Sequence, residues 1–264
     1  MKVTSIGDSA FQECKKLKSV VIPNGVTSIG NKAFYFCFHL TDLVIPSSVK
    51  TLGEEAFNSC YGFTDITLPN GIESIGDAAF DNCVYLTSIS IPESVKHIGE
   101  KAFTCCRSLT SVKLPDGIKN LADSTFSYCR GLKSVELPES ITEIEKYAFF
   151  ECNELVSINI PSNVTQIGYK AFYNTAIVNN QTNTVKYVGN WAVQCDENAA
   201  SATIKSGTVG VAEYAFAYCK SMTNVTIPDG LKYLSDYAFY RDEALTSVKI
   251  PGSVKSTTCD ICTY

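Results

Sequence analysis

Residues 17–39 read LKSVVIPNGVTSIGNKAFYFCFH, and this stretch recurs along almost the whole chain of 264 residues. Phenylalanine returns every 23 residues from Phe11 to Phe172, and the spacing resumes at Phe216. The prolines keep the same spacing from Pro23 to Pro161, and the spacing resumes at Pro228. Repetition at a fixed period of roughly 20 to 50 residues is typical of a solenoid, in which each repeat forms one coil.

One copy of the repeat predicts the structure of one coil. In residues 17–22 the apolar side chains alternate, which favours a short strand with one buried face. The Pro-Asn-Gly sequence that starts at Pro23 turns the chain. Val26 and Ile29 bring a second short strand back to the core. The segment 31–37 places Ala, Phe and Cys inward, as one helical or 3₁₀ turn would.

A single coil cannot bury these side chains, whereas a stack in register buries each against its copies above and below. The sequence therefore predicts a leucine-rich-repeat type solenoid of about eleven 23-residue coils. We expect short parallel β-strands, a helical or 3₁₀ turn in each coil, and a mostly β structure with irregular turns. Residues 1–264 are expected to form one domain.

The period slips between Phe172 and Phe216, which are 44 residues apart. Residues 174–208 lack the proline and predict a degenerate coil with a looser, protruding turn. This coil is either drift in a tolerant solenoid or a functional insertion. Trp191, the only tryptophan, stands where the repeat has Ala-Phe and is interpreted as a core substitute for phenylalanine. Residues 251–264 form an incomplete C-terminal coil.

The composition limits the partners. A net charge of −5 argues against nucleic acid, because phosphate backbones are bound by clustered Lys and Arg. No apolar run approaches the roughly 20 residues that a membrane helix needs, so no membrane insertion is expected. The N-terminus has no signal-peptide pattern and begins within repeat sequence. We therefore expect a piece of a longer protein that carries further domains.

Eight of the 12 cysteines stand three residues after a repeat phenylalanine. This position favours buried free thiols, with disulfides as the alternative. A single column of thiols does not surround a metal ion, so neither a metal site nor a cofactor is expected. Cys105 is expected near the surface, and Cys195 falls in the degenerate coil. Cys259 and Cys262 form a C-x-x-C pair that indicates a frayed end or a local disulfide rather than a redox site.

With I-P, I-G, A-F and C at these positions, the repeat resembles the BspA-type (treponemal-type) leucine-rich repeat. The resemblance covers nearly the whole chain, from Val3 to about Val254. It implies a bacterial surface or secreted protein involved in adhesion or protein recognition, and no catalytic motif. Single coils depart from the pattern, since Ala122 and Glu145 replace the glycine and Asp242 replaces the cysteine.

The residues give little support to an enzyme. His39 and His97 occupy different repeat positions, so stacking does not bring them together; His39 is expected to cap a turn and His97 to point outward. No nucleophile elbow, phosphate loop or HExxH motif occurs. An enzyme would need a compact pocket, most plausibly around residues 179–194.

Two surfaces are candidates for binding. The first is the outward face of the first strand of each coil, which suits an extended partner, although threonine is also simply a good exposed strand residue. Its candidate residues are Val21, Thr41, Asp42, Val44, Thr64, Asp65, Thr67, Thr87, Ser90, Thr110 and Lys113. The second is an aromatic turn side, which marks an interface or covers the rim of the core. Its residues are Tyr35, Phe36, Phe38, Tyr61 and Tyr85.

The functional hypothesis is an extracellular or cell-surface module for adhesion or protein interaction. Its expected partner is a protein, such as a host or extracellular-matrix protein, or a glycan. The alternative is a structural spacer or stalk within a larger surface protein, with no ligand of its own. The sequence does not name the ligand or decide which face binds it.

Overall fold

The computed structural model describes residues 2–257 and contains a regular repetition of short strands along the chain. Two strands in each coil produce two sets of parallel strands, and all strand pairs but one are parallel. The first set comprises β2 Ser19–Val21, β4 Asp42–Val44, β6 Asp65–Thr67, β8 Ser88–Ser90, β10 Ser111–Lys113, β12 Ser134–Glu136, β14 Ser157–Ile158, β18 Ser201–Thr203 and β20 Asn224–Thr226.

The second set is shorter, with two residues in each strand. It comprises β1 Ser5–Ile6, β3 Ser28–Ile29, β5 Thr51–Leu52, β7 Ser74–Ile75, β9 His97–Ile98, β11 Asn120–Leu121, β13 Glu143–Ile144, β15 Gln166–Ile167, β19 Gly210–Val211, β21 Tyr233–Leu234 and β22 Ser256–Thr257. Ser5 pairs with Ser28, and Ser28 pairs with Thr51, so the register advances by one repeat of 23 residues per coil. The chain is thus a mostly β parallel solenoid, as the repeat predicts, and has about ten turns where about eleven coils were expected.

The core is a set of side-chain columns. Phe34 and Phe57 stack with ring centroids 5.4 Å apart, and the column continues without interruption from Phe11 to Phe172. Fully buried aromatic rings supply large apolar areas, and offset-stacked pairs add about 0.5–1.5 kcal/mol each. The geometric expectation that repeat positions lie on top of one another is confirmed.

The buried thiol column is confirmed for seven of the eight repeat cysteines, whereas Cys14 in the first coil is exposed. Cys37, Cys60, Cys83, Cys106, Cys129 and Cys152 are free and buried. Each Sγ donates to the carbonyl oxygen of a phenylalanine 26 residues earlier, as Cys129 does to Phe103 at 3.0 Å. Burial raises the pKa of the Cys37 thiol to about 11, so these groups stay protonated. Cys105 is half-buried, while Cys259 and Cys262 lie outside the described residues.

The turn at residues 30–37 differs from the expected helical or 3₁₀ turn. It is a chain of β-turns in which Ala33 donates to Gly30, Tyr35 to Lys32 and Cys37 to Phe34. Lys32 and Phe36 adopt φ of 55° and 59°, which a right-handed helix excludes. The alternating left-handed residues free the N–H groups between the turns to bond the next coil, as Phe34 does to Ala56 at 2.8 Å. Inter-coil bonding therefore takes the place of a helix.

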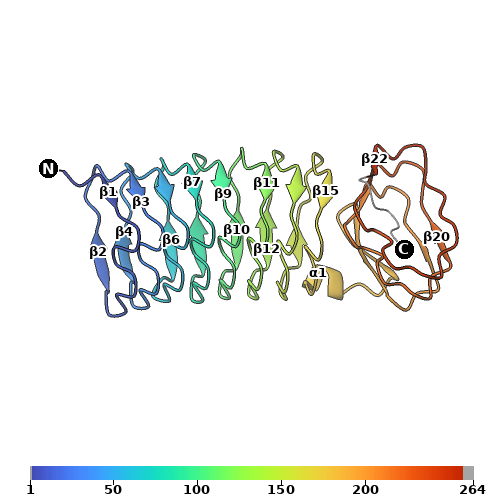
Figure 1. Cartoon of the computed structure of the whole chain (residues 1–264), viewed down its shortest axis with the longest axis horizontal. Helices are drawn as coiled ribbons and strands as arrows, with labels where there is room; N and C mark the ends of the chain where they lie inside the picture. Colours follow the sequence, from blue (N-terminus) through green and yellow to red (C-terminus); the bar gives the residue numbers. More distant parts are fainter. Residues whose placement is uncertain (1, 258–264) are drawn as a thin grey trace.

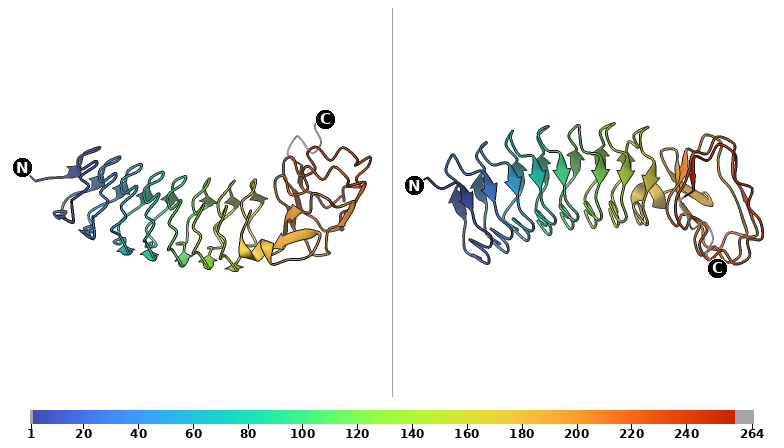
Figure 2. Two further views of the ribbon diagram at one scale, coloured as in Figure 1. Left: turned by 90° about the horizontal axis from the view of Figure 1, so that it is seen from below. Right: turned by 45° about the horizontal axis from the view of Figure 1, so that its top comes forward.

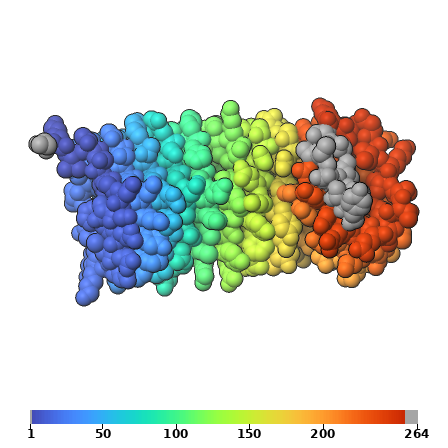
Figure 3. All heavy atoms as spheres, viewed as in Figure 1, coloured from blue at the N-terminus to red at the C-terminus, as the bar shows by residue number. Residues whose placement is uncertain are grey.

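The regular stack ends at a different local structure. The helix α1, Ala176–Asn179, is followed by β16 Val185–Val188 and β17 Trp191–Cys195, which form an antiparallel hairpin. Trp191 then pairs with Gly210, only 19 residues further on. Figures 1 and 2 show one axis from β1 to β15 and a changed direction of the coils after α1. On the face drawn in Figure 3 the body is nonetheless continuous.

Trp191 lies in the core, but not in the phenylalanine column that the sequence suggested. It is 2% exposed and shares its strand register with Gly210 and Tyr233, with its ring stacked on Tyr233 at 5.9 Å. The backbone position of the phenylalanine is taken by Cys195, whose N–H donates to Ala215 at 2.6 Å. A Cβ on Gly210 would lie 2.4 Å from the indole, so glycine makes room for the tryptophan. The expectation of one domain across residues 1–264 stays a prediction.

Candidate functional site

The strand face predicted from sequence is exposed at all of its candidate positions. Most of it is polar, but Val21 and Val44 are 91% and 70% exposed and pair directly between β2 and β4. Two neighbouring valines on a solvated strand form a small apolar patch. Further along the same column Lys113 and Glu136 are 3.7 Å apart.

The threonines of this face have a structural role as well. The hydroxyl of Thr87 donates to the carbonyl of Thr64 at 2.8 Å, and that of Thr110 donates to Thr87 at 3.4 Å. Thr41 bonds Lys18 in the same way. These hydroxyl groups bond each coil to the preceding one and are therefore already used within the chain. The side chains of Val21 and Val44 have no such contact role and are exposed for a partner to cover.

The aromatic turn side is mainly packed against itself. Tyr35 and Phe36 stack at 4.1 Å, and Phe38 and Tyr61 stack at 4.9 Å; all four are half-buried. Tyr85 differs, because it is 61% exposed. Four of the five aromatic residues therefore cover the rim of the core, which was one of the two interpretations of the sequence.

The two histidines lie apart in the regular stack. Nδ1 of His39 is 2.6 Å from the carbonyl oxygen of Lys15, which ties its turn to the coil before. His97 is exposed in β9. Neither reaches Cys195, so no thiol and histidine are paired for nucleophilic catalysis near the hairpin.

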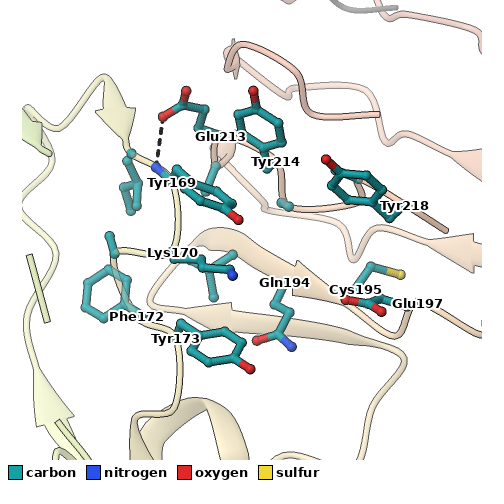
Figure 4. A pocket seen from close by; sticks show the side chains of 17 residues that line it. Tyr169, Lys170, Phe172, Tyr173, Gln194, Cys195, Glu197, Glu213, Tyr214 and Tyr218 are labelled. Atoms are coloured by element: carbon teal, nitrogen blue, oxygen red, sulfur yellow. Dashed lines mark hydrogen bonds between the residues drawn. The ribbon is translucent and has the colours of Figure 1, made fainter. Parts of the chain in front are cut away.

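A pocket of about 380 Å³ opens where the regular stack ends. One wall is the turn at residues 168–173, the opposite wall is the turn at 212–218, and β17 supplies the floor. Figure 4 shows the rings and the polar side chains that surround it. The residues that line it are Ile167, Gly168, Tyr169, Lys170, Ala171, Phe172, Tyr173, Val193, Gln194, Cys195, Glu197, Ala212, Glu213, Tyr214, Ala215, Ala217 and Tyr218.

The pocket exists because the degenerate coil has no turn at this level. In the regular stack each turn bonds the turn before it, whereas here residues 191–195 form the strand β17, whose Cys195 donates to Ala215. Glu213 spans the resulting gap, since its N–H donates to Ile167 at 2.9 Å and its Oε2 accepts from the N–H of Tyr169 at 2.8 Å. Burial raises the pKa of the Glu213 carboxyl.

Lys170 is held at the mouth between aromatic rings. Its Nζ lies 5.0 Å from the ring centroid of Tyr169 and 4.9 Å from that of Tyr173, within cation–π range. A hydrogen bond with the side chain of Tyr169 raises the pKa of Lys170, so the ammonium stays charged. On the other wall the ring of Tyr214 lies 4.8 Å from that of Tyr169.

Sequence reasoning pointed to this neighbourhood but missed most of the lining. Residues 179–194 contribute Gln194 and Val193, whereas the tyrosines come from the turns on either side. A signal was present: ten of the 14 tyrosines lie between residues 128 and 240. The pattern could not show that two turns 44 residues apart face each other across a gap.

Neither a metal-holding cluster nor a membrane-spanning helix is found in the part of the chain that the structure describes. No group of three or more Cys, His, Asp or Glu side chains between residues 2 and 257 is arranged to hold a metal ion. In the same part of the chain, no helix has the length and apolar character needed to cross a bilayer.

Stacked 23-residue coils with an apolar column and parallel strands define a leucine-rich-repeat solenoid. The model of the BspA type leucine rich repeat region, with 6 copies, matches residues 1–84, 73–198 and 178–261. The chain therefore belongs to the BspA-type leucine-rich repeat family, as the resemblance implied.

Solved structures of bacterial repeat proteins are similar. A leucine-rich repeat protein from Bacteroides ovatus is 31% identical with a TM-score of 0.66, covering 96% of this chain and 71% of its own. A leucine rich cell surface protein from Faecalibacterium prausnitzii is 27% identical with a TM-score of 0.55, covering 96% of this chain and 71% of its own. A leucine rich repeat protein from T. pallidum is 36% identical with a TM-score of 0.52, covering 57% of this chain and 72% of its own. No curated protein matches the chain.

Proposed function

We propose that this chain is a non-enzymatic binding module at the bacterial cell surface or outside the cell, which adheres to a macromolecular partner through its strand face. The observation that carries the proposal is the apolar pair of Val21 and Val44, which is exposed to solvent although both side chains would gain by burial. Burying a valine side chain contributes about 1.5–3 kcal/mol. The location is supported by the similar structure from F. prausnitzii, which is that of a leucine rich cell surface protein.

The polar remainder of the face fits a rim around that apolar pair. Protein interfaces commonly have an apolar centre within polar surroundings. Asp42 lies on β4 two residues before Val44, Thr41 directly precedes this strand, and both are exposed. A protein partner, such as a host or extracellular-matrix protein, is the occupant that this arrangement favours.

The test is binding of the whole chain to a panel of immobilised extracellular-matrix proteins, measured by surface plasmon resonance. The double variant Val21→Asp, Val44→Asp introduces charge at the centre of the patch and should weaken binding by about tenfold or more, or 1.4 kcal/mol. Thr226→Asp is the matched control, because Thr226 occupies the same repeat position on β20 and is exposed. Equal binding by both variants would show that the partner is bound by another surface, and no binding by the unmodified chain would favour the spacer.

A further inference from the structure

The interruption of the stack leaves backbone donors on one wall of the pocket. In the preceding coil three N–H groups donate to the next turn: Tyr147 to Tyr169, Phe149 to Ala171 and Glu151 to Tyr173, at 2.8–2.9 Å. The equivalent groups one repeat later belong to Lys170, Phe172 and Asn174. Within residues 2–257 none of these three donates to a backbone carbonyl. Such groups are paired almost everywhere in folded proteins, by the chain, water or a ligand.

The opposite wall carries the complementary acceptors. In a regular coil the carbonyls at the positions of Glu213, Ala215 and Ala217 accept from the preceding turn. Here only Ala215 does, from Cys195 at 2.6 Å. Across the described chain, the carbonyls of Glu213 and Ala217 accept no backbone N–H. The pocket therefore offers donors on one side and acceptors on the other.

The side chains add aromatic faces and mixed polarity. Tyr173 and Tyr218 bring rings to the two walls, and Gln194 on β17 can both donate and accept. The charged lining groups are the Lys170 ammonium and the carboxyl groups of Glu197 and Glu213. The lining thus has one positive and two negative groups. The carboxyl groups disfavour a strongly anionic ligand, and the ring pair of Tyr169 and Tyr173, which could hold a cation, is already occupied by Lys170.

The shape limits the ligand further. Glu213 bonds both Ile167 and Tyr169, so the two walls are joined directly at one end of the pocket. An extended peptide that bonded the donors of one wall and the acceptors of the other, in place of the missing turn, would need to pass through this closed end. A compact group that enters end first meets no such obstacle, and about 380 Å³ lies in the range of small-molecule pockets.

We infer that this pocket binds the terminal sugar ring of a neutral glycan. Sugar hydroxyl groups donate and accept at once, so one ring can satisfy the N–H groups of Lys170 and Phe172 and the carbonyl of Ala217. The C–H face of the ring packs on a tyrosine, as apolar surfaces pack on aromatic rings. The pocket lies on other coils than Val21 and Val44, so this inference and the proposed function can fail separately.

The experiment uses an array of neutral and acidic glycans, followed by calorimetry with the neutral oligosaccharides that bind, and with an unstructured peptide library as comparison. Tyr218→Ala should weaken binding of the neutral glycan by about tenfold, the loss of one good aromatic contact. The matched control is Tyr128→Ala, because Tyr128 has the same repeat position, a similar φ of 58° against 66°, and an exposure of 37% against 42%. The control should bind within about twofold.

Folding is checked by circular dichroism and by the fluorescence of Trp191. Gln194→Leu, which keeps the size of the side chain and removes the amide, should also weaken binding while the fold is retained. The inference is overturned if no neutral glycan binds at millimolar concentration, if only acidic glycans or peptides bind, or if Tyr218→Ala and Tyr128→Ala bind alike. Loss of matrix-protein binding in the Val21 and Val44 variant has no bearing on these results.

Discussion

The coils before the hairpin and the coils after it use the same repeat but differ in continuity. From Phe11 to Phe172 every ring stacks on the next, with centroids 5.1–5.7 Å apart. After the hairpin, Phe216 and Phe239 are the described members of the column, and their planes are tilted by 36°. A coil in a solenoid is stabilised by its neighbours. The comparison shows that a single altered coil weakens this support. It also leaves backbone N–H and carbonyl groups without the partners that they have in a regular stack.

The largest expected difference between the regions concerns the phenylalanine column. Phe103→Ala removes a buried ring that stacks on Phe80 and on Phe126, and should lower the free energy of unfolding by about 3–5 kcal/mol. Phe216→Ala loses one aromatic neighbour, Phe239, and should cost about 1 kcal/mol less. Urea denaturation followed by circular dichroism measures both. Equal losses would mean that the two regions are packed equally well.

The second expected effect concerns the junction itself. Gly210→Ala places a Cβ against the Trp191 ring and should destabilise the fold by about 1–3 kcal/mol. Gly252→Ala is the control, since no atom lies within 4 Å of its added Cβ. Fluorescence of Trp191 reports the junction, and circular dichroism reports all coils.

The same two signals test whether residues 1–264 form one domain. If they do, the fluorescence and dichroism transitions of the unmodified chain coincide. Gly210→Ala then shifts both together. A fluorescence transition at lower urea, with much of the dichroism retained, would show that the junction separates two folding units.

The sequence predicts the regular region well because its determinants are local and repeated. Phe34, Cys37 and Ile29 each recur at one spacing, and a period alone is enough to place them in columns. The turn at residues 30–37 was expected to be helical or 3₁₀ because of the spacing of its inward side chains. The left-handed φ values of Lys32 and Phe36 could not be foreseen, because neither residue type favours them. Two such non-glycine residues per coil are set by inter-coil hydrogen bonds, which are a property of the stack.

The junction could not be predicted in the same detail. Trp191 was interpreted as a core substitute for phenylalanine because it stands where the repeat has Ala-Phe. Its register instead depends on the antiparallel hairpin and on Gly210, 19 positions later, which no repeat contains. The pocket depends on a missing turn, and only its tyrosines were visible in the sequence.

The third effect is a dependence on pH that differs between the regions. Burial raises the pKa of Asp81, in the regular stack, to about 6, and that of Asp242, in the last coils, to about 7, from an ordinary 3.8. Because the folded state then holds the proton more tightly than the unfolded chain, the free energy of unfolding falls as pH rises from about 4 to each raised value. The C-terminal coils should continue to lose stability above pH 6, where the effect of Asp81 is complete.

Asn substitutions isolate the two contributions. Asp81→Asn keeps an acceptor for Asn58 and should stabilise the fold at pH 7.5 by about 1–2 kcal/mol, less than the full shift because the carboxyl is partly exposed. At pH 4 the gain should vanish. Asp242→Asn should behave likewise in the C-terminal coils, while Asp65→Asn on the strand face serves as the control. Melting temperatures measured across this pH range test these variants. A gain in stability that persists at pH 4 would show that its cause is packing and not the charge of the carboxylate.

The smallest effect is a difference in thiol accessibility, which leaves stability unchanged. Cys106 is fully buried between two regular coils, whereas Cys195 lines the pocket and is 3% exposed. Labelling requires local opening for either thiol, and opening is easier where neighbouring coils share fewer bonds. Among these four described thiols, alkylation of the native protein, mapped by mass spectrometry, should label exposed Cys14 first, half-buried Cys105 next, then Cys195, and Cys106 last. If Cys106 reacts as fast as Cys195, the interruption does not loosen the solenoid, and the two regions open as one.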